Sequence, residues 1–138
     1  MNANRLADTV YWVSLVNPRD AFHHVTIATA KQLGDHRIVT SEMVLVEVLN
    51  FLSAHGTALR QAAVDLVYAI AGAQGVELVP QDSQLFREAL TLYRDRPDKQ
   101  WSLTDCASFL IMEQRGLTEA LTLDQHFEQY GFRALLRS

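Results

Sequence analysis

Four acidic side chains at widely separated positions are the residues of this sequence that could carry out chemistry together. They are Asp8, Glu47, Asp105 and Asp124. Carboxylates gathered in one pocket repel each other unless a divalent cation neutralises them, and their hard oxygen atoms select Mg²⁺ or Mn²⁺. Such a cation generates hydroxide from water and holds the attacking and leaving oxygens of an in-line phosphodiester displacement. If the fold brings the four acids together, they predict a metal-dependent site for phosphodiester hydrolysis.

Each aspartate also has a purely structural interpretation. Asp8 and Asp124 stand where a predicted strand ends and a helical turn begins, and aspartate is a favoured helix N-cap. Asp105 follows Ser102 by three residues, which is the spacing of a capping box. Taken one at a time, Asp8 and Asp124 are better explained by capping than by metal binding, so both interpretations stay open.

Glu47 has no capping explanation. It is the only charged residue between Met43 and Leu52, a segment so apolar that we expect a helix buried on all sides. An unpaired carboxylate there is unstable or takes up a proton, so Glu47 should meet a cation or hydrogen-bond donors. Asn50 lies one turn later on the same face and could share that partner. The structural alternative is that a nearby arginine or backbone groups satisfy Glu47.

The elements that must position these acids alternate between strands and helices. Strands are predicted at residues 5–8, 38–40, 76–79 and 120–123, with an edge strand near 132–136. Helices are predicted from residue 9 to before Pro18, and over 20–33, 41–52, 57–70, 83–93 and 102–115. This alternation indicates an α/β domain, a mainly parallel sheet between two helical layers. Ligand sites of such sheets form beyond the carboxyl ends of the strands, so Asp8 and Asp124 share one crevice if their strands are neighbours.

Length and composition set the remaining limits. The 138 residues, 49% of them hydrophobic, fit one domain spanning 1–138. No apolar run reaches the ~18 residues of a membrane-spanning helix, so we expect a cytoplasmic protein that makes no membrane association. One cysteine excludes an internal disulfide. A net charge of −4 gives no general attraction for nucleic acid, so a polyanionic substrate must meet a local basic patch or a metal ion.

Two further groups of residues lie near the acids in sequence. Arg94, Arg96 and Lys99, on the predicted loop before the last long helix, could contact RNA phosphates at the mouth of a cleft. A solvated charged loop is the alternative. His126, two residues after Asp124, is interpreted as a packing or capping residue, and Cys106 as a core residue.

The sequence does not support two other kinds of phosphate chemistry. An aspartyl-nucleophile phosphatase would need a second aspartate two residues after Asp8, where the chain has Val10. The sequence also lacks the G-x-x-x-x-G-K-[ST] motif of a P-loop.

Motifs in four regions carry a resemblance to a known family. Residues 7–9 read ADT, residues 40–47 read TSEMVLVE, residues 102–109 read SLTDCASF, and residues 122–127 read TLDQHF, with GF following at 131–132. In order and spacing the chain resembles PIN-domain ribonucleases, and most nearly the VapC-like toxins of bacterial toxin–antitoxin pairs. The last two motifs are the specific part. One departure is the first strand, where NRLA replaces the usual strongly apolar run.

The resemblance implies a three-layer α/β/α sandwich and a Mg²⁺- or Mn²⁺-dependent endoribonuclease that hydrolyses single-stranded or structured RNA. Carried over residue by residue, Asp8, Glu47, Asp105 and Asp124 match the family's metal-binding catalytic quartet. Thr9 and Thr104 match hydroxyls that often accompany it. The resemblance also implies a homodimer and a small antitoxin protein that occupies the cleft. The alternative function is a non-catalytic PIN-like module that binds RNA or protein.

Overall fold

A single parallel sheet forms the centre of the protein, whose computed structural model describes residues 4–34 and 37–137. Within those residues the strands are β1 (Asn4–Ala7), β2 (Arg37–Ser41), β3 (Val76–Val79), β4 (Glu119–Leu121) and β5 (Arg133–Ala134). They pair in the order β3-β2-β1-β4-β5, and every pair is parallel. The predicted parallel sheet, with an edge strand at its C-terminal end, is confirmed.

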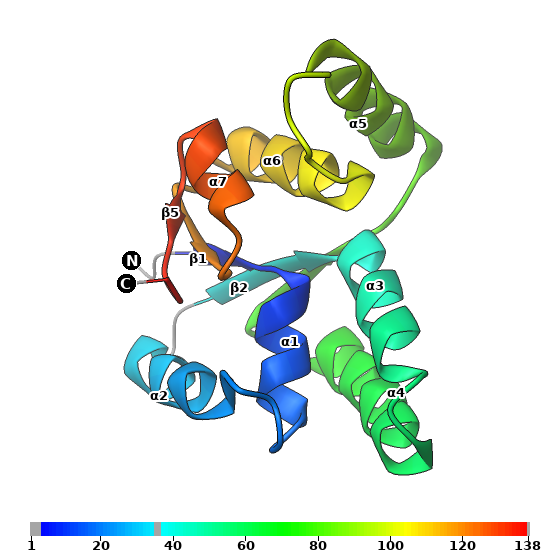
Figure 1. The fold of residues 1–138 in the computed structure, drawn as a ribbon, viewed down its shortest axis with the longest axis vertical. Helices are drawn as coiled ribbons and strands as arrows, with labels where there is room; N and C mark the ends of the chain where they lie inside the picture. The colour runs from blue at the N-terminus through cyan, green and yellow to red at the C-terminus, as the bar shows by residue number, and fades with distance from the viewer. Residues whose placement is uncertain (1–3, 35–36, 138) are drawn as a thin grey trace.

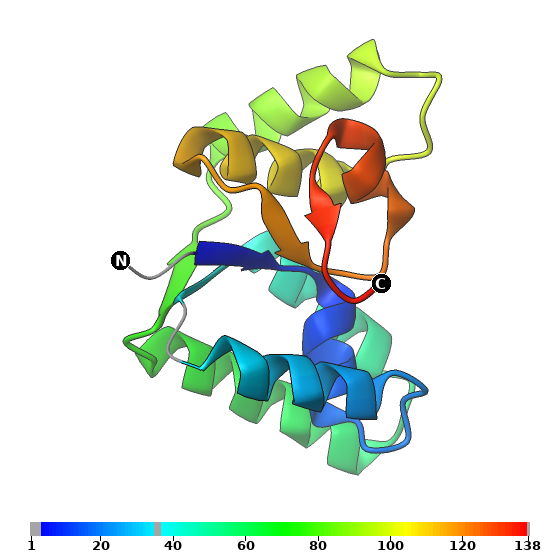
Figure 2. The ribbon, with the colours of Figure 1, turned by 90° about the vertical axis from the view of Figure 1, so that its left-hand side faces the viewer.

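Helices cover both faces of this sheet (Figures 1 and 2). One layer holds α1 (Thr9–Val16), α2 (His23–Leu33), α3 (Glu42–Leu52) and α4 (Thr57–Gly72), and the other holds α5 (Ser83–Asp95), α6 (Leu103–Arg115) and α7 (Gln125–Tyr130). Each layer has its own core, with Trp12 and Val44 in the first and Phe109 and Phe127 in the second. The predicted three-layer α/β/α sandwich is confirmed. Within the described residues, no helix has the length and apolarity needed to span a bilayer.

Local capping chemistry fixes several helix ends where the sequence predicts them. The Ser41 hydroxyl accepts a hydrogen bond from the Val44 N–H at 3.1 Å and starts α3, and the Asp82 carboxylate accepts one from the Leu85 N–H at 2.8 Å and starts α5. Gly116 ends α6 in the left-handed conformation with φ at 65°, which glycine adopts without steric cost.

Several predicted boundaries are wrong by two to three residues, and three of them bear on the site or its neighbouring loops. The second helix begins at His23 and not at Asp20, because the Asp20 carboxylate accepts a hydrogen bond from the Phe22 N–H at 2.9 Å and stabilises a turn instead. Strand β4 ends at Leu121, two residues earlier than predicted. Helix α5 continues to Asp95, so the charged loop begins at Arg96 and not at Arg94.

The prediction that the helix over residues 41–52 is buried on all sides is wrong. In α3, Val46 is 48% exposed and Phe51 is 50% exposed. The helix packs against α1 and α4, with smaller contacts to β2 and α6, and leaves Val46 and Phe51 on the side that faces solvent. An all-round apolar pattern therefore does not report complete burial in this helix.

The topology creates a crevice between two neighbouring strands. From β1 the chain turns into α1 on one face of the sheet, whereas from β4 it turns into α7 on the other face. Because β1 and β4 are paired in parallel, their carboxyl ends lie side by side and their outgoing segments diverge. A ligand site is expected at such a switch point. Asp8 and Asp124 follow these two strands.

Candidate metal centre

Asp8 is a buried carboxylate at the N-cap position of α1, and its side chain does not cap the helix. It follows β1 and is 7% exposed, and its side chain makes no capping hydrogen bond to α1. Its Oδ2 accepts a hydrogen bond from the Thr122 hydroxyl at 2.8 Å. Burial raises the pKa of Asp8 to about 7, and the neighbouring charges of Asp105 and Glu47 act in the same direction. Asp8 is therefore the N-cap residue of α1 by position, as predicted, but capping does not explain its side chain, and a nearby cation would favour the ionised form of this carboxylate.

Asp105 combines a structural role with a place in the site. It completes the predicted capping box at the start of α6: its N–H donates to the Ser102 hydroxyl at 3.0 Å, and its Oδ2 accepts from the Ser102 N–H at 3.1 Å. The same Oδ2 lies 3.0 Å from Nδ1 of His126. Burial raises the pKa of this carboxyl, and its hydrogen bonds oppose the shift. Asp105 therefore both caps α6 and belongs to the group of acids at the site.

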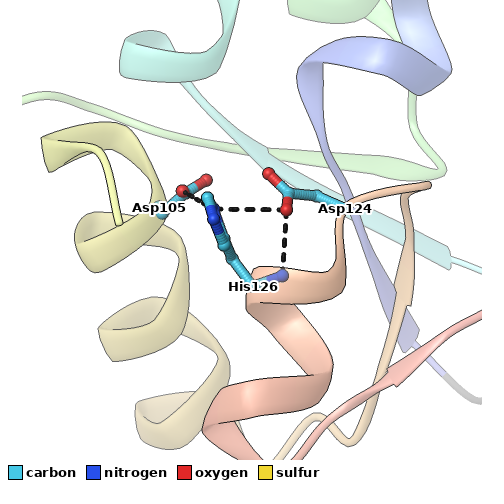
Figure 3. Close-up of side chains that lie close together, drawn as sticks. All are labelled: Asp105, Asp124 and His126. Carbon is cyan, nitrogen blue, oxygen red and sulfur yellow. Dashed lines mark hydrogen bonds and ion pairs between the residues drawn. The ribbon is translucent and has the colours of Figure 1, made fainter. Parts of the chain in front are cut away.

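Asp124 is the N-cap of α7, as predicted. Its Oδ1 accepts a hydrogen bond from the His126 N–H at 2.9 Å and lies 3.2 Å from the His126 Nδ1. The cap holds the carboxylate at the end of β4, where it faces Asp105 across the His126 ring (Figure 3). The capping interaction thus orients Asp124 toward the cluster.

His126 is the residue whose role the sequence interpretation misjudged. Its Nδ1 contacts the carboxylates of both Asp105 and Asp124, so it is part of the acidic cluster and neither a packing nor a capping side chain (Figure 3). One ligand atom from each of the three residues lies within 4.8 Å of the others. The only sign of this role in the sequence was the D-x-H spacing of Asp124 and His126, which places the imidazole ring beside the N-cap of α7.

Glu47 reaches the site from the half-exposed helix α3. It is half-buried and accepts a hydrogen bond from the Thr9 hydroxyl at 2.7 Å. The partner is a hydroxyl group, and not the arginine or backbone groups of the structural alternative. Asn50 is exposed and lines a separate pocket beside Arg60, and the buried Thr104 is not among the residues that line the acidic pocket.

All four predicted acids line one pocket of about 500 Å³. Thr9 and His126 also line it, as do the apolar side chains of Val10, Val13, Phe51 and Leu123. The acids come from the ends of β1 and β4, from α3 and from the first turn of α6. Segments separated by more than half of the chain therefore converge on a single acidic pocket with one apolar wall.

Comparison with known proteins assigns the fold to a family. Residues 5–133 match the family model for the PIN domain. The chain belongs to the PIN-domain family. This PIN domain is 31% identical over 131 residues to the 23S rRNA-specific endonuclease VapC20 of Mycobacterium tuberculosis, from strain CDC 1551 / Oshkosh and from strain ATCC 25618 / H37Rv. The alignments cover 91% of this chain and 92% of each relative.

A solved structure gives the same result. The crystal structure of M. tuberculosis VapC20, described as a sarcin–ricin-loop-cleaving toxin, superposes on this PIN domain with a TM-score of 0.81 and 25% sequence identity. The superposition covers 92% of this chain and 95% of the other. The predicted resemblance to PIN-domain ribonucleases, and to VapC-like toxins in particular, is confirmed.

Thr122 is a buried residue of this PIN domain that the sequence analysis missed. Its hydroxyl donates to Asp8 Oδ2 at 2.8 Å and accepts a hydrogen bond from the Asp124 N–H at 3.0 Å. One hydroxyl therefore ties the end of β1 to the end of β4 and fixes two of the acids relative to each other. The signal was present in the T-x-D spacing of residues 122–124.

The donor set of the PIN domain fits a divalent metal ion. The carboxylates of four residues line the pocket, and the Nδ1 atom of His126 lies close to two of them, those of Asp105 and Asp124. Hard divalent cations prefer oxygen ligands and accept an imidazole nitrogen, and their charge relieves the repulsion between acids. The pocket can therefore bind a metal ion through the carboxylates, with His126 Nδ1 available as a further donor.

Proposed function

We propose that this PIN domain is a metal-dependent endoribonuclease of the VapC toxin type. In this proposal Asp8, Glu47, Asp105 and Asp124 hold one or two Mg²⁺ or Mn²⁺ ions. The observation that carries it is the convergence of these four acids, from four separate segments, on one pocket at the switch point of the sheet. The family match and the likeness to VapC20 support RNA as the substrate.

The side chains of the pocket are arranged to hold carboxylate oxygens in fixed positions. A bound divalent cation would supply an activated water and would stabilise the oxygens of the phosphodiester as it is cleaved. Thr122 orients Asp8, Thr9 orients Glu47, and the Ser102 N–H orients Asp105. Such supporting hydrogen bonds set ligand geometry before the substrate arrives.

The proposed substrate is structured ribosomal RNA, in particular an exposed hairpin loop. VapC20 is named for 23S rRNA and is described as cleaving the sarcin–ricin loop. This chain covers 92% of that relative and has the same fold, which makes the same RNA the first substrate to test. Bases in a loop are unstacked and accessible to a shallow pocket.

The same relationship supports three biological proposals. The first is a small antitoxin protein that covers the acidic pocket, the second is a homodimer, and the third is a cytoplasmic location where ribosomes are present. The half-exposed Phe51 on the pocket wall offers an apolar contact to such an antitoxin. Co-purification with the product of the neighbouring reading frame tests the first proposal.

Cleavage by single-site variants tests the proposed activity. Asp8→Asn and Asp105→Asn keep the size of the side chain and remove a charge from the pocket, so each should abolish Mn²⁺-dependent cleavage of RNA while the circular dichroism spectrum stays unchanged. The protein must first be freed of any bound partner. Metal-dependent cleavage by both variants would refute the assignment. No cleavage of any RNA by the wild-type protein would favour the alternative, a non-catalytic module that binds RNA or protein.

A further inference from the structure

The residues that line the acidic pocket supply no positive side chain for the phosphates of a bound RNA strand. Among the described residues that line it, none is a lysine or an arginine. A metal ion there neutralises the acids and the phosphate being cleaved, but an RNA strand carries further phosphates on either side. Those phosphates need cations outside the pocket, because most of the affinity for nucleic acid comes from phosphate contacts.

Two smaller pockets continue from the acidic one along the loop between α5 and α6. One of them, the second pocket, is lined by Asp98, Lys99 and Gln100 of this loop, and by Gln125, His126 and Gln129 of α7. The third is lined by residues that include Tyr93, Arg94, Arg96, Lys99 and Gln100. The loop and α7 lie on the same side of the sheet (Figure 2).

Shared residues join the three pockets into one track. Gln100 lines all three, His126 lines the acidic and the second pocket, and Lys99 lines the second and the third. A residue that lines two pockets lies between them. The track therefore runs from the acids, over Gln100, to a pocket with basic and aromatic side chains.

The cations in the last turn of α5 and in the following loop are not equivalent. The guanidinium of Arg94 pairs with Asp95 at 2.9 Å, and that of Arg96 pairs with Asp98 through two hydrogen bonds of 3.0 Å. Each of these two guanidinium groups therefore already has a carboxylate partner at the surface. Lys99 is half-buried, and within the described residues its ammonium group has no direct hydrogen bond or ion pair. The pKa of the neighbouring Asp98 carboxyl is lowered mainly by its hydrogen bond with Arg96 and to a smaller extent by the charge of Lys99. Lys99 is the cation of this loop that is available to an incoming phosphate.

We infer that the RNA strand beside the cleaved bond lies along this track, and that the Lys99 ammonium binds one of its backbone phosphates. The inference rests on the proposed endoribonuclease function. The exposed ring of Tyr93 in the third pocket gives a base a surface on which to stack. Arg94 and Arg96, held by their acidic neighbours, shape the track and contribute less to phosphate binding.

The lysine content of the chain provides a direct test without any substitution. The chain has two lysines, Lys99 on the track and Lys31 in α2. Helix α2 lies on the opposite face of the sheet (Figures 1 and 2). The full-length protein is acetylated with an amine-reactive ester in the presence and absence of a short single-stranded RNA of mixed sequence. Ca²⁺ replaces Mg²⁺ and Mn²⁺ in these samples, and the RNA is checked to be intact after the reaction. Mass spectrometry then measures the acetylation of each lysine.

Bound RNA should protect Lys99 severalfold and leave Lys31 unchanged. Equal reactivity of Lys99 with and without bound RNA overturns the inference, as does protection of both lysines alike or a complete lack of RNA binding. The outcomes separate the inference from the proposed activity. Protection of Lys99 together with a lack of Mn²⁺-dependent cleavage of any RNA, including the ribosomal loop, keeps the track and refutes the nuclease, whereas cleavage without protection of Lys99 does the reverse.

Matched variants give a second, quantitative test. Lys99→Ala should lower the slope of log affinity against log salt concentration by about 0.7, the contribution of one phosphate contact on single-stranded nucleic acid. Lys31→Ala removes the same charge and should leave the slope unchanged, and Lys99→Arg should keep it. Gln100→Glu should weaken RNA binding by placing a negative charge on the track, whereas Gln32→Glu on the exposed side of α2 should not. An unchanged slope in Lys99→Ala contradicts the phosphate contact.

Discussion

Removing the negative charge of Asp8 should stabilise the metal-free protein, although the same change should abolish activity. In the folded protein burial raises the pKa of Asp8 from 3.8 to about 7. Between these two values the folded state binds a proton that the unfolded state has lost. The folded state is therefore progressively destabilised as the pH rises from about 4 to about 7, and the full penalty is present above pH 7.

The size of this effect follows from the two pKa values. Their difference of about three pH units corresponds to about 4 kcal/mol in the free energy of unfolding, at 1.36 kcal/mol per unit. Asp8→Asn removes the penalty, and the amide oxygen can still accept the hydrogen bond from Thr122. In EDTA the variant should therefore be more stable than the wild type by about 4 kcal/mol at pH 8, and by about 2 kcal/mol at pH 5.

Urea unfolding of both proteins at the two pH values, followed by circular dichroism, measures this difference. Asp65→Asn, at an exposed position of α4, is the control and should change the unfolding free energy by less than about 0.5 kcal/mol at either pH. Adding Mn²⁺ should stabilise the wild type more than Asp8→Asn, because the cation binds the folded state through this carboxylate. The reasoning fails if Asp8→Asn is less stable than the wild type at pH 8 in EDTA, or if the stability difference is the same at both pH values.

Two further predictions concern the hydrogen bonds that support the acids. Thr122→Val should lower the unfolding free energy by about 1–3 kcal/mol and weaken Mn²⁺ binding measured by calorimetry, because it removes the hydroxyl shared by Asp8 and Asp124. Thr122→Ser keeps a hydroxyl and should retain both properties. Unchanged Mn²⁺ affinity in Thr122→Val would contradict this role. Ser102→Ala should lower the unfolding free energy by about 1 kcal/mol, because the capping hydrogen bond at the start of α6 is lost. The measurement is the midpoint of thermal unfolding, which should fall. An unchanged midpoint would show that the capping box does not stabilise the protein.

The sequence predicted the sheet and the helical layers because these depend on local patterns, whereas the quartet of acids came from the family resemblance. Turn residues and caps mark the ends of most elements, and parallel strands necessarily bring Asp8 and Asp124 to one edge. Glu47 was placed correctly for a wrong reason. The apolar residues around it suggested complete burial, yet Val46 and Phe51 are half exposed, and a residue pattern alone does not show which apolar side chains meet the protein's own core.

The contacts that the sequence could not predict join residues far apart in the chain. The hydrogen bond from Thr122 to Asp8 spans 114 residues, and the contact between His126 and Asp105 spans 21 residues. Neither follows from helical or strand periodicity, because each depends on the distance between segments in the folded protein. The track over Gln100 could not be predicted from the sequence for the same reason, because it requires the α5–α6 loop to lie beside α7.

The most direct test of the account is the position of Mn²⁺ in a crystal of the protein soaked with that ion, located by its anomalous scattering. We predict a peak in the acidic pocket within coordination distance of carboxylate oxygens from Asp8, Glu47, Asp105 and Asp124, directly or through bound water, and a weaker or absent peak in Asp8→Asn. An empty pocket at saturating Mn²⁺, or a peak bound only by residues outside this pocket, would contradict it.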